Sequence, residues 1–380
     1  METPNSVFTG LSICIITKNQ ADKLERCLQA IRACLLQNSP DHKCEIVVVD
    51  TGSTDNTMEI ANKYDAATYE FPWIDDFAAA KNAAISYAAH DLILILDTDE
   101  YIEPESSETD RITRILSMAS ADSKCVGRIN RINKYTNAEG QEIEYSEWIN
   151  RLFDRRLYHY EGRIHEQLVS INDSSVTYPT RKTTIHIFHD GYDLSPEKMK
   201  EKAERDASLL KLSIKENPND PYLWYQLGKA NFAAKDYPAA EEAFFSALSL
   251  NPASNLEYTE DLIETAGYTL LNLKKAPEAL QLLVPYHNDD PFRHSADFQF
   301  LYATVLMNNG RFEDALNTFL YCTTLPASRT KGTNSFMSWY NAGVILEVAG
   351  MPTEALDYYQ KADNYAPAAA GIERVKQHLK

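Results

Sequence analysis

The stretch Leu92-Ile93-Leu94-Ile95-Leu96-Asp97-Thr98-Asp99 decides how the first half of the chain is expected to fold. Its five consecutive aliphatic residues are typical of a strand that is buried on both faces of a parallel sheet. Asp97 and Asp99 follow at the C-terminal end of that strand, the edge where open α/β sheets bind ligands. Paired carboxylates suit Mg²⁺ or Mn²⁺ shared with a substrate phosphate, so the position favours a metal-assisted site.

Composition narrows the class of protein. The chain has 380 residues, 44% of them hydrophobic and 24% charged, which is ordinary globular usage and enough for two or three domains. A net charge of −18 argues against a nucleic-acid-binding surface. The sequence shows neither a signal peptide nor an apolar run of about 20 residues that would span a membrane. We therefore expect a cytoplasmic protein, with peripheral contact with the inner face of the membrane as an alternative.

The six cysteines have neither C-x-x-C spacing nor dense pairing. They predict reduced thiols and no structural zinc.

Strand-like and helix-like stretches alternate from about residue 10 to residue 190. The expected strands are 11–16, 45–50, 68–71 and 92–96, and the expected helices are 21–36, 57–64 and 77–89 with Asp76 as N-cap. This alternation predicts right-handed crossovers and a parallel sheet. Polar clusters at 17–19, 50–53 and 97–99 follow three of the strands, and matching strand ends would line one crevice.

The second half, from residue 221, is helical and repetitive. Its first repeat has the spacing of a tetratricopeptide repeat, carried by Trp224, Leu227, Gly228, Ala240, Phe244, Ala247 and Pro252. Ala240, Ala279, Ala315 and Ala355 recur at intervals slightly longer than the usual repeat of about 34 residues. The expected domains are residues 10–195 and 221–380, joined by a helical linker over 196–220.

The first half closely resembles the family 2 glycosyltransferases, which have the GT-A (nucleotide-diphospho-sugar transferase) fold. The matching motifs are Ile15-Ile-Thr-Lys-Asn19, Val49-Asp-Thr-Gly-Ser-Thr-Asp55, Asp76-Phe-Ala-Ala-Ala-Lys-Asn82 and Leu96-Asp-Thr-Asp-Glu100. Residues 150–156 and 160–166 are similar to a subgroup that includes lipopolysaccharide-core transferases and bacteriocin peptide S-glycosyltransferases. The expected fold is a Rossmann-like α/β GT-A domain followed by an all-α tetratricopeptide-repeat solenoid.

The resemblance implies a nucleotide-sugar site at the strand ends. The carboxylate of Asp50 would accept hydrogen bonds from the pyrimidine or ribose, and Gly52 would permit close backbone approach. Lys81 would neutralise the diphosphate, with a solvated helix lysine as the alternative. Asp55 is expected to cap a helix instead. The implied nucleotide-sugar contacts are Thr17, Asn19, Asp50, Gly52, Lys81, Asp97 and Thr98.

The resemblance also implies a divalent metal, Mn²⁺ or Mg²⁺, that bridges the two phosphates of the donor. Asp99 would bind the metal, while Asp97 would contact the ribose or donor sugar and contribute to the metal site. His186 and His189 are both candidates for a third ligand, and we favour His189. The metal matters because the leaving group is a nucleoside diphosphate whose negative charge grows as the glycosidic bond breaks.

An inverting transfer needs a base that takes the proton of the acceptor. Many relatives use the Asp of an E-D pair, which is missing from residues 101–195; Glu260-Asp261 occurs only in the repeats, where we expect a helix surface. Glu166 is the favoured base. Glu147 and Asp154 are rivals, and Glu161 is a weaker one. A thiol acceptor would need a base less, because part of it is already ionised at neutral pH.

Three features depart from the family pattern or stay open. Thr51 replaces an acid of the usual motif, and Lys81-Asn82-Ala83-Ala84 replaces R-N-x-G. Trp148 and the tyrosines between Tyr135 and Tyr160 either stack on substrate or simply pack. A basic set would hold phosphate, acceptor carboxylates or a membrane surface: Arg151, Arg155, Arg156 and Arg163.

Our leading hypothesis is a metal-dependent inverting enzyme that uses a UDP-sugar. Its repeats would recruit a peptide or protein acceptor or form a homodimer, because repeat solenoids offer extended concave surfaces. One alternative is a transferase that acts on a lipid-linked or cell-envelope glycan. Another is a repeat-based adaptor whose transferase half is degenerate.

Overall fold

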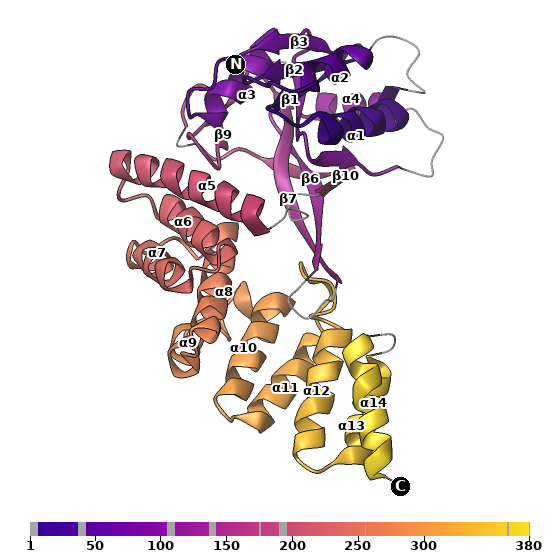
Figure 1. Ribbon diagram of the computed structural model, residues 1–380, viewed down its shortest axis with the longest axis vertical. Coiled ribbons are helices and arrows are strands. Elements are labelled where there is room, and N and C mark those ends of the chain that lie inside the picture. Colours follow the sequence, from indigo (N-terminus) through magenta and orange to yellow (C-terminus); the bar gives the residue numbers. More distant parts are fainter. Residues whose placement is uncertain are drawn as a thin grey trace. The chain divides into compact units, whose positions relative to one another are not determined.

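The computed structural model describes residues 7–36, 43–104, 111–136, 142–174, 176–189, 196–254, 256–362 and 365–379. The chain forms two compact units, residues 1–195 and residues 196–380 (Figure 1). The first is an α/β unit on a mixed sheet, and the second is built from helices, as the predicted fold class requires. No helix in the described ranges is long and apolar enough to cross a membrane.

The main sheet of the first unit has eight strands in the order β3-β2-β1-β4-β7-β6-β10-β5. Its parallel half comprises β1 (Leu11–Thr17), β2 (Cys44–Asp50), β3 (Ala67–Glu70) and β4 (Leu92–Asp97). Its other half comprises β7 (Glu142–Asp154), β6 (Val126–Thr136), β10 (Thr180–His189) and β5 (Glu100–Ile102). β7 runs antiparallel to both β4 and β6, and β5 runs antiparallel to β10, so the sheet is mixed. The predicted parallel pairing holds for β1 to β4, and β6 and β10 also pair in parallel.

A separate pair of strands, β8 (Tyr158–Glu161) and β9 (Gln167–Ser170), forms a small antiparallel ribbon.

Helices cover both faces of the parallel half. One face packs against α1 (Ala21–Ile31), its π-helical continuation Arg32–Leu36, and α4 (Arg111–Ala121). The other face packs against α3 (Phe77–Tyr87), which begins where the Asp76 carboxylate accepts a hydrogen bond from the Ala79 N–H at 2.8 Å. Along β4, side chains alternate between the two clusters, which confirms a strand buried on both faces. A further helix, α2 (Thr57–Lys63), follows β2.

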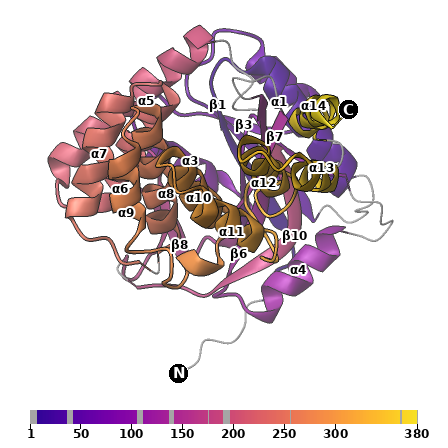
Figure 2. The ribbon, with the colours of Figure 1, turned by 90° about the horizontal axis from the view of Figure 1, so that it is seen from below.

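The second unit is a succession of helix pairs (Figure 2). Its helices are α5 (Pro196–Glu216), α6 (Pro221–Ala233), α7 (Tyr237–Ser249), α8 (Glu257–Asn272), α9 (Ala276–Leu283), α10 (Ala296–Asn308), α11 (Phe312–Cys322), α12 (Phe336–Val348), α13 (Pro352–Lys361) and α14 (Ala366–His378). The segment expected to link two domains is mostly α5, which packs against α6 inside this unit.

The repeat signature marks where paired helices touch. All four signature alanines, Ala240, Ala279, Ala315 and Ala355, are fully buried on the second helix of a pair. A Cβ added to Gly228 would lie 2.4 Å from the Phe244 ring, so only glycine fits between these two helices. The predicted repeat architecture therefore rests on small residues that let neighbouring helices approach closely.

Candidate functional site

The polar strand ends predicted to form one crevice do lie side by side. β1 pairs in parallel with both β2 and β4, with Thr17 opposite Asp50 and Ile16 opposite Asp97. The C-terminal ends of three neighbouring strands therefore meet at one edge of the sheet. This is the edge at which open α/β sheets bind ligands.

The loops after β1 and β2 are tied to each other by their own polar side chains. The Asn19 carboxamide oxygen accepts a hydrogen bond from the Thr54 N–H at 2.7 Å, and the Asn19 N–H donates to Ser53 Oγ at 2.8 Å. The Asp50 carboxylate accepts from the N–H groups of Ser53 at 2.9 Å and Gly52 at 3.3 Å. Gly52 has a φ of +107°, a conformation that glycine adopts readily. Asn19, Asp50 and Gly52 thus fix the shape of these two loops at the strand ends.

Thr17 and Thr51 make the junction between the first two strands. The Thr51 N–H and hydroxyl both donate to the Thr17 carbonyl oxygen, at 2.9 and 3.0 Å. The Thr17 hydroxyl is buried and has no hydrogen-bond partner in the part of the chain that the structure describes. A buried hydroxyl without a partner at a ligand-binding edge marks a place for a substrate or water atom.

Asp55 contacts the start of α2. Its carboxylate accepts from the Thr57 N–H at 3.0 Å, and the helix N-cap itself is Asn56. Asp55 therefore supports this helix end, in line with the expected structural role.

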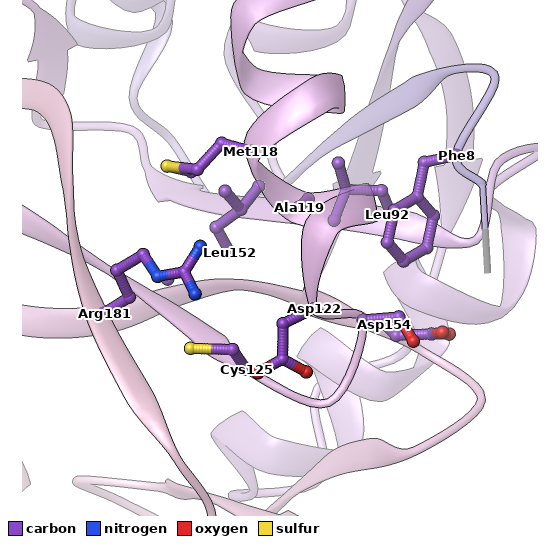
Figure 3. A pocket seen from close by; sticks show the side chains of 11 residues that line it. Phe8, Leu92, Met118, Ala119, Asp122, Cys125, Leu152, Asp154 and Arg181 are labelled. Atoms are coloured by element: carbon purple, nitrogen blue, oxygen red, sulfur yellow. The ribbon is translucent and has the colours of Figure 1, made fainter. Parts of the chain in front are cut away.

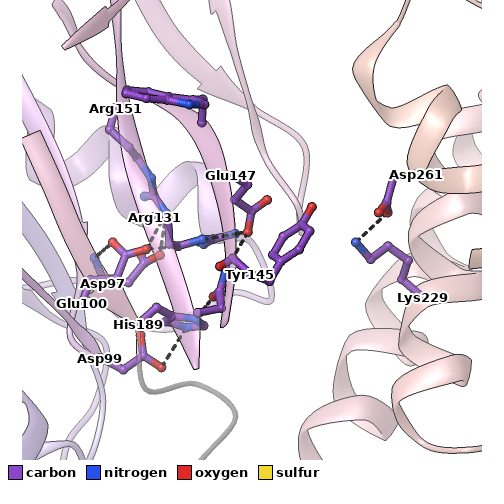
Figure 4. A network of polar contacts seen from close by, with 12 residues as sticks. Asp97, Asp99, Glu100, Arg131, Tyr145, Glu147, Arg151, His189, Lys229 and Asp261 are labelled. Carbon is purple, nitrogen blue, oxygen red and sulfur yellow. Dashed lines mark hydrogen bonds and ion pairs between the residues drawn. The ribbon is translucent and has the colours of Figure 1, made fainter. Parts of the chain in front are cut away.

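Asp97 is held between two buried cations. Its carboxylate lies 3.1 Å from Lys81 Nζ. It lies 2.7 Å from Arg151 Nη2, and both of these residues are labelled in Figure 4. Burial would raise the pKa of Asp97, but the charges of Arg151 and Lys81 hold that pKa well below its usual value. Lys81 is only 4% exposed, which removes the solvated-lysine alternative. Asp97 is thus an ionised carboxylate with both cations already placed.

Arg151 reaches Asp97 because of a β-bulge in β7. Gly127 of β6 pairs with Leu152, whereas the next residue, Arg128, pairs with Asn150. Arg151 is therefore the extra residue of the bulge and is not paired with a residue of β6. Such an extra residue re-aims a side chain, often beside an active site. Arg151 is 8% exposed, so this member of the predicted basic set is part of the buried cluster.

Two members of this cluster were missed by the sequence analysis. Glu100 is fully buried, and its carboxylate accepts from the Asp97 N–H at 2.9 Å while lying 3.4 Å from both Arg151 Nη2 and Arg131 Nη1. The signal for Glu100 was its place directly after the Asp97-Thr98-Asp99 motif. Arg131 gave no comparable signal because only strand pairing brings β6 to this position. Thr98 is itself buried.

Asp99 faces a different set of residues. Its carboxylate lies 3.6 Å from both Lys23 Nζ and His189 Nε2, and His189 Nδ1 lies 2.8 Å from the Asn133 carboxamide oxygen. Burial would raise the pKa of Asp99, but its hydrogen bond to His189 and the nearby charges lower it to about 2. Among the described residues no three carboxylate, imidazole or thiol groups converge on one point. The structure brings Asp99 and His189 together, whereas the Asp97 carboxylate is occupied by cations.

The two histidines that are candidates for a metal ligand differ in their contacts. His186 Nδ1 lies 3.1 Å from Asn130 Nδ2, and its ring packs edge-on against Trp148. Lys182 Nζ lies 4.9 Å from the ring centroid of Trp148, which is half-buried. The side chain of Tyr135 lies outside the described part. Only His189 of the histidine pair contacts Asp99.

Glu166, the favoured base, joins the same cluster through Lys81. Glu166 Oε1 lies 2.5 Å from Lys81 Nζ, so one ammonium contacts both Glu166 and Asp97. The Asn82 side chain supports this arrangement, because it donates to the Tyr160 carbonyl oxygen at 2.8 Å and accepts from the Tyr160 N–H at 3.0 Å. The helix α3 therefore fixes both the lysine and the segment that leads to Glu166.

The rival bases occupy other positions. Glu147 lies 2.8 Å from Arg131 Nη2, deep in the ion-pair network (Figure 4). The side chain of Glu161 is 51% exposed and contacts His159. Asp154 is opposite Leu92, at the far end of β4 from Asp97, where it pairs with Arg156. Of the four candidates, only Glu166 shares a cation with Asp97 itself, because Lys81 contacts both carboxylates.

A narrow cavity at that far end of β4 is not a rival site. Its volume is about 10 Å³, and Leu92, Asp154 and Arg181 are among its lining residues (Figure 3). A space of this size holds about one water molecule.

Comparisons with known proteins find a similarity in each of the two units. Residues 12–178 match the family model "Glycosyl transferase family 2", and residues 207–255 match "Tetratricopeptide repeat". A TPR repeat-containing protein of Synechococcus elongatus is 29% identical over 242 residues, 62% of this chain and 56% of that protein. The SPbeta prophage-derived glycosyltransferase SunS of Bacillus subtilis is 27% identical over 220 residues, 57% of this chain and 47% of that protein.

The chain thus spans about half the length of these curated relatives. Among solved structures, the TPR protein YrrB, described as having an unusual peptide-binding site, aligns at 20% identity with a TM-score of 0.39. That alignment covers 47% of this chain and 84% of YrrB. The matched ranges lie in different units: the first unit is similar to family 2 glycosyltransferases, and the second unit is similar to tetratricopeptide repeats.

Proposed function

We propose that the protein is a metal-dependent, inverting glycosyltransferase that moves a sugar from a UDP-sugar to a peptide or protein acceptor. The observation that carries this proposal is the joint placement of two groups at one sheet edge. These are Asp97 with its buried cations and Asp99 with His189. The matched family supplies the reaction class, and the strand-end position supplies the binding edge.

The residues present fit a divalent cation. The low pKa of Asp99 keeps its carboxylate ionised, and its side chain is 18% exposed, so it is accessible. Asp99 and His189 would hold Mg²⁺ or Mn²⁺, which usually take few protein ligands and complete their shell with waters and substrate phosphates. When bound, the ion would neutralise charge on the diphosphate leaving group.

The charge balance of the site also supports a cation requirement. Among the described residues that these ion pairs connect, five carboxylates outnumber four cationic side chains: Asp97, Asp99, Glu100, Glu147 and Glu166 against Lys23, Lys81, Arg131 and Arg151. Every one of these cations is already paired with a carboxylate. A diphosphate would add further negative charge to this edge, where partial burial weakens solvent screening. A divalent ion is therefore expected to be needed for tight donor binding.

The protein's own groups then have distinct tasks. The loops that hold Asn19 and Asp50 would cradle the nucleotide, and the Thr17 hydroxyl would complete its hydrogen bonds there. Glu166 would accept the proton of the acceptor as that acceptor attacks the anomeric carbon from the face opposite the nucleotide. Lys81 would orient Glu166, because it contacts that carboxylate directly.

The repeats support a polypeptide acceptor. Stacked helix pairs present long continuous surfaces, which suit an extended chain better than a single sugar.

The test is release of UDP by the purified protein from a panel of sugar nucleotides, with Mn²⁺, with Mg²⁺ and with a chelator. We expect slow, metal-dependent release from one donor. Asp99→Ala should lower that rate by on the order of 10²-fold, because it removes the carboxylate that would hold the cation.

Asp91→Ala is the matched control. Asp91 is an aspartate that precedes β4 at the opposite end of the strand, where it pairs with Arg155 and Arg156. Its removal should leave UDP release unchanged. Failure of every donor to bind or react, with the protein folded, would overturn the proposal.

A further inference from the structure

The second unit contains a cavity that the proposed transfer reaction does not use. Its volume is about 430 Å³, within the range of about 300–1,000 Å³ typical of small-molecule sites. It lies between α10, α11 and the connection that leads from α9 into α10. The lining residues are His287, Asn288, Arg293, Gln299, Tyr302, Asn317, Thr318 and Tyr321.

The wall formed by the α9–α10 connection is pinned in place. Gln299 Nε2 donates to the His287 carbonyl oxygen at 2.8 Å and to that of Phe292 at 3.2 Å. The Tyr321 hydroxyl donates to the Arg293 carbonyl oxygen at 3.0 Å. The His287 ring stacks on Tyr302, with centroids 4.7 Å apart. These contacts come from the cavity's own residues, so the cavity is preformed.

The chemistry of the lining is selective. It consists of aromatic rings, carboxamides, three hydroxyl groups (those of Tyr302, Thr318 and Tyr321) and one guanidinium. Among the described residues it includes no carboxylate and no aliphatic side chain. The lack of carboxylates disfavours a metal ion, and the lack of aliphatic groups disfavours a hydrophobic anchor residue. Carboxamides both donate and accept hydrogen bonds, which matches a ligand that carries many hydroxyl groups.

Several groups remain available for such a ligand. Asn317 is exposed, and its carboxamide has no hydrogen-bond partner among the described residues. The Arg293 side chain is 52% exposed, and its nearest acidic partner, Asp290, is 3.7 Å away. Tyr321 is 38% exposed and offers part of its ring. Aromatic rings provide an apolar face beside these polar groups.

We propose that this cavity is a carbohydrate-binding site for neutral sugar residues, separate from the transfer site. The choice of a sugar rests on the proposed function, in which the protein handles glycosylated molecules. It rests equally on the cavity itself, which is confined to one inter-repeat connection. An extended peptide would instead run across successive repeats. A site of this kind would retain a glycosylated acceptor or product near the enzyme.

The test is titration of the protein with the neutral trisaccharides maltotriose, cellotriose and N,N′,N″-triacetylchitotriose, followed by ligand-observed NMR and calorimetry. We expect saturable binding of at least one. The double substitution Arg293→Ala with Asn317→Ala should weaken it at least about tenfold. The matched control is Arg311→Ala with Asn308→Ala, which removes an arginine and an asparagine of the same unit that do not line the cavity.

Asp99→Ala separates this proposal from the proposed function. It should abolish metal-dependent UDP release and leave trisaccharide binding intact. Three results would overturn the carbohydrate site: no binding of any trisaccharide, binding that the cavity substitutions do not change, or binding that disappears in Asp99→Ala. Trisaccharide binding by a protein that releases no UDP would support the cavity while overturning the transferase.

Discussion

Each of the two units buries a charged cluster, and the two clusters differ in what surrounds them. In the first unit, Asp97, Lys81 and Arg151 lie where three parallel strands end. In the second, Arg329 contacts Glu264 at 2.5 Å and Glu260 at 3.2 Å, between helices of the stack. Backbone N–H groups of Arg329 and Thr330 also donate to the Asp297 carboxylate, at 2.7 and 2.9 Å. The second cluster therefore fixes a connecting segment.

The difference teaches that buried charge by itself does not identify a site. Both clusters contain carboxylates whose pKa values are shifted: that of Asp97 is lowered, and that of Glu264 is raised by burial despite Arg329. What separates them is position, because only the first stands at the ligand-binding edge of a sheet. Four substitutions test this comparison.

The largest effect is expected for Arg151→Met. The substitution removes the cation shared by the half-buried Asp97 and the fully buried Glu100. Loss of one partner of a buried ion pair typically lowers the free energy of unfolding by about 3–5 kcal/mol. It should also abolish metal-dependent UDP release. Urea denaturation and the release assay measure the two effects. Full activity in a stable Arg151→Met protein would show that this cluster is not part of the active site.

Arg329→Met should have a smaller effect on stability and none on chemistry. It leaves Glu264 buried without its partner, but the arginine side chain is 27% exposed, so we expect a loss of about 1–3 kcal/mol. UDP release per folded molecule should be unchanged. Arg311→Met is the control, since its pair with Asp314 is about half exposed. Loss of UDP release in Arg329→Met would contradict the distinction drawn between the clusters.

Gly228→Ala tests the packing of the repeats. The added methyl would meet the Phe244 ring at 2.4 Å, and overpacking of this kind costs about 1–3 kcal/mol. Combining it with Phe244→Leu should recover part of the loss relative to the sum of the single substitutions. Thermal denaturation of the four proteins gives the coupling. Strict additivity would show that these two residues do not share one space.

The smallest effect on stability is expected for Tyr160→Phe. The Tyr160 hydroxyl is buried and has no hydrogen-bond partner among the described residues, so its loss should change the free energy of unfolding by less than about 0.5 kcal/mol. Tyr158→Phe is the contrast, because the Tyr158 hydroxyl donates to the Lys124 carbonyl oxygen; its loss should cost about 1 kcal/mol. If only Tyr160→Phe weakens donor binding, the hydroxyl contacts the substrate.

Local patterns in the sequence were enough to predict much of the fold. The run from Leu92 to Leu96 identified a strand buried on both faces, and the motif spacing placed Asp97 and Asp99 at its end. Features that depend on contacts between distant segments could not be predicted from the sequence, because strand pairing between such segments has no local signature. The bulge that aims Arg151, and the register that brings Arg131 to Glu100, are both of this kind.

One interpretation was wrong for the same reason. Glu260-Asp261 was expected on a helix surface, yet Asp261 accepts hydrogen bonds from Tyr225 and Lys229 of α6, and Glu260 contacts Arg329. Their partners lie more than 30 residues away in the chain. Helical periodicity shows that two residues share a region of a helix, but it does not show which charges a neighbouring helix will present to them.

The single ammonium of Lys81 has a consequence for the timing of events in the site. It is in contact with both Asp97 and Glu166, which we propose to face the donor and the acceptor respectively. A ligand that draws Asp97 away would leave Lys81 with Glu166 alone, and the field at that carboxylate would change. Arrival of the first substrate would thus be communicated to the residue that receives the second, over the length of one side chain and without any movement of the backbone.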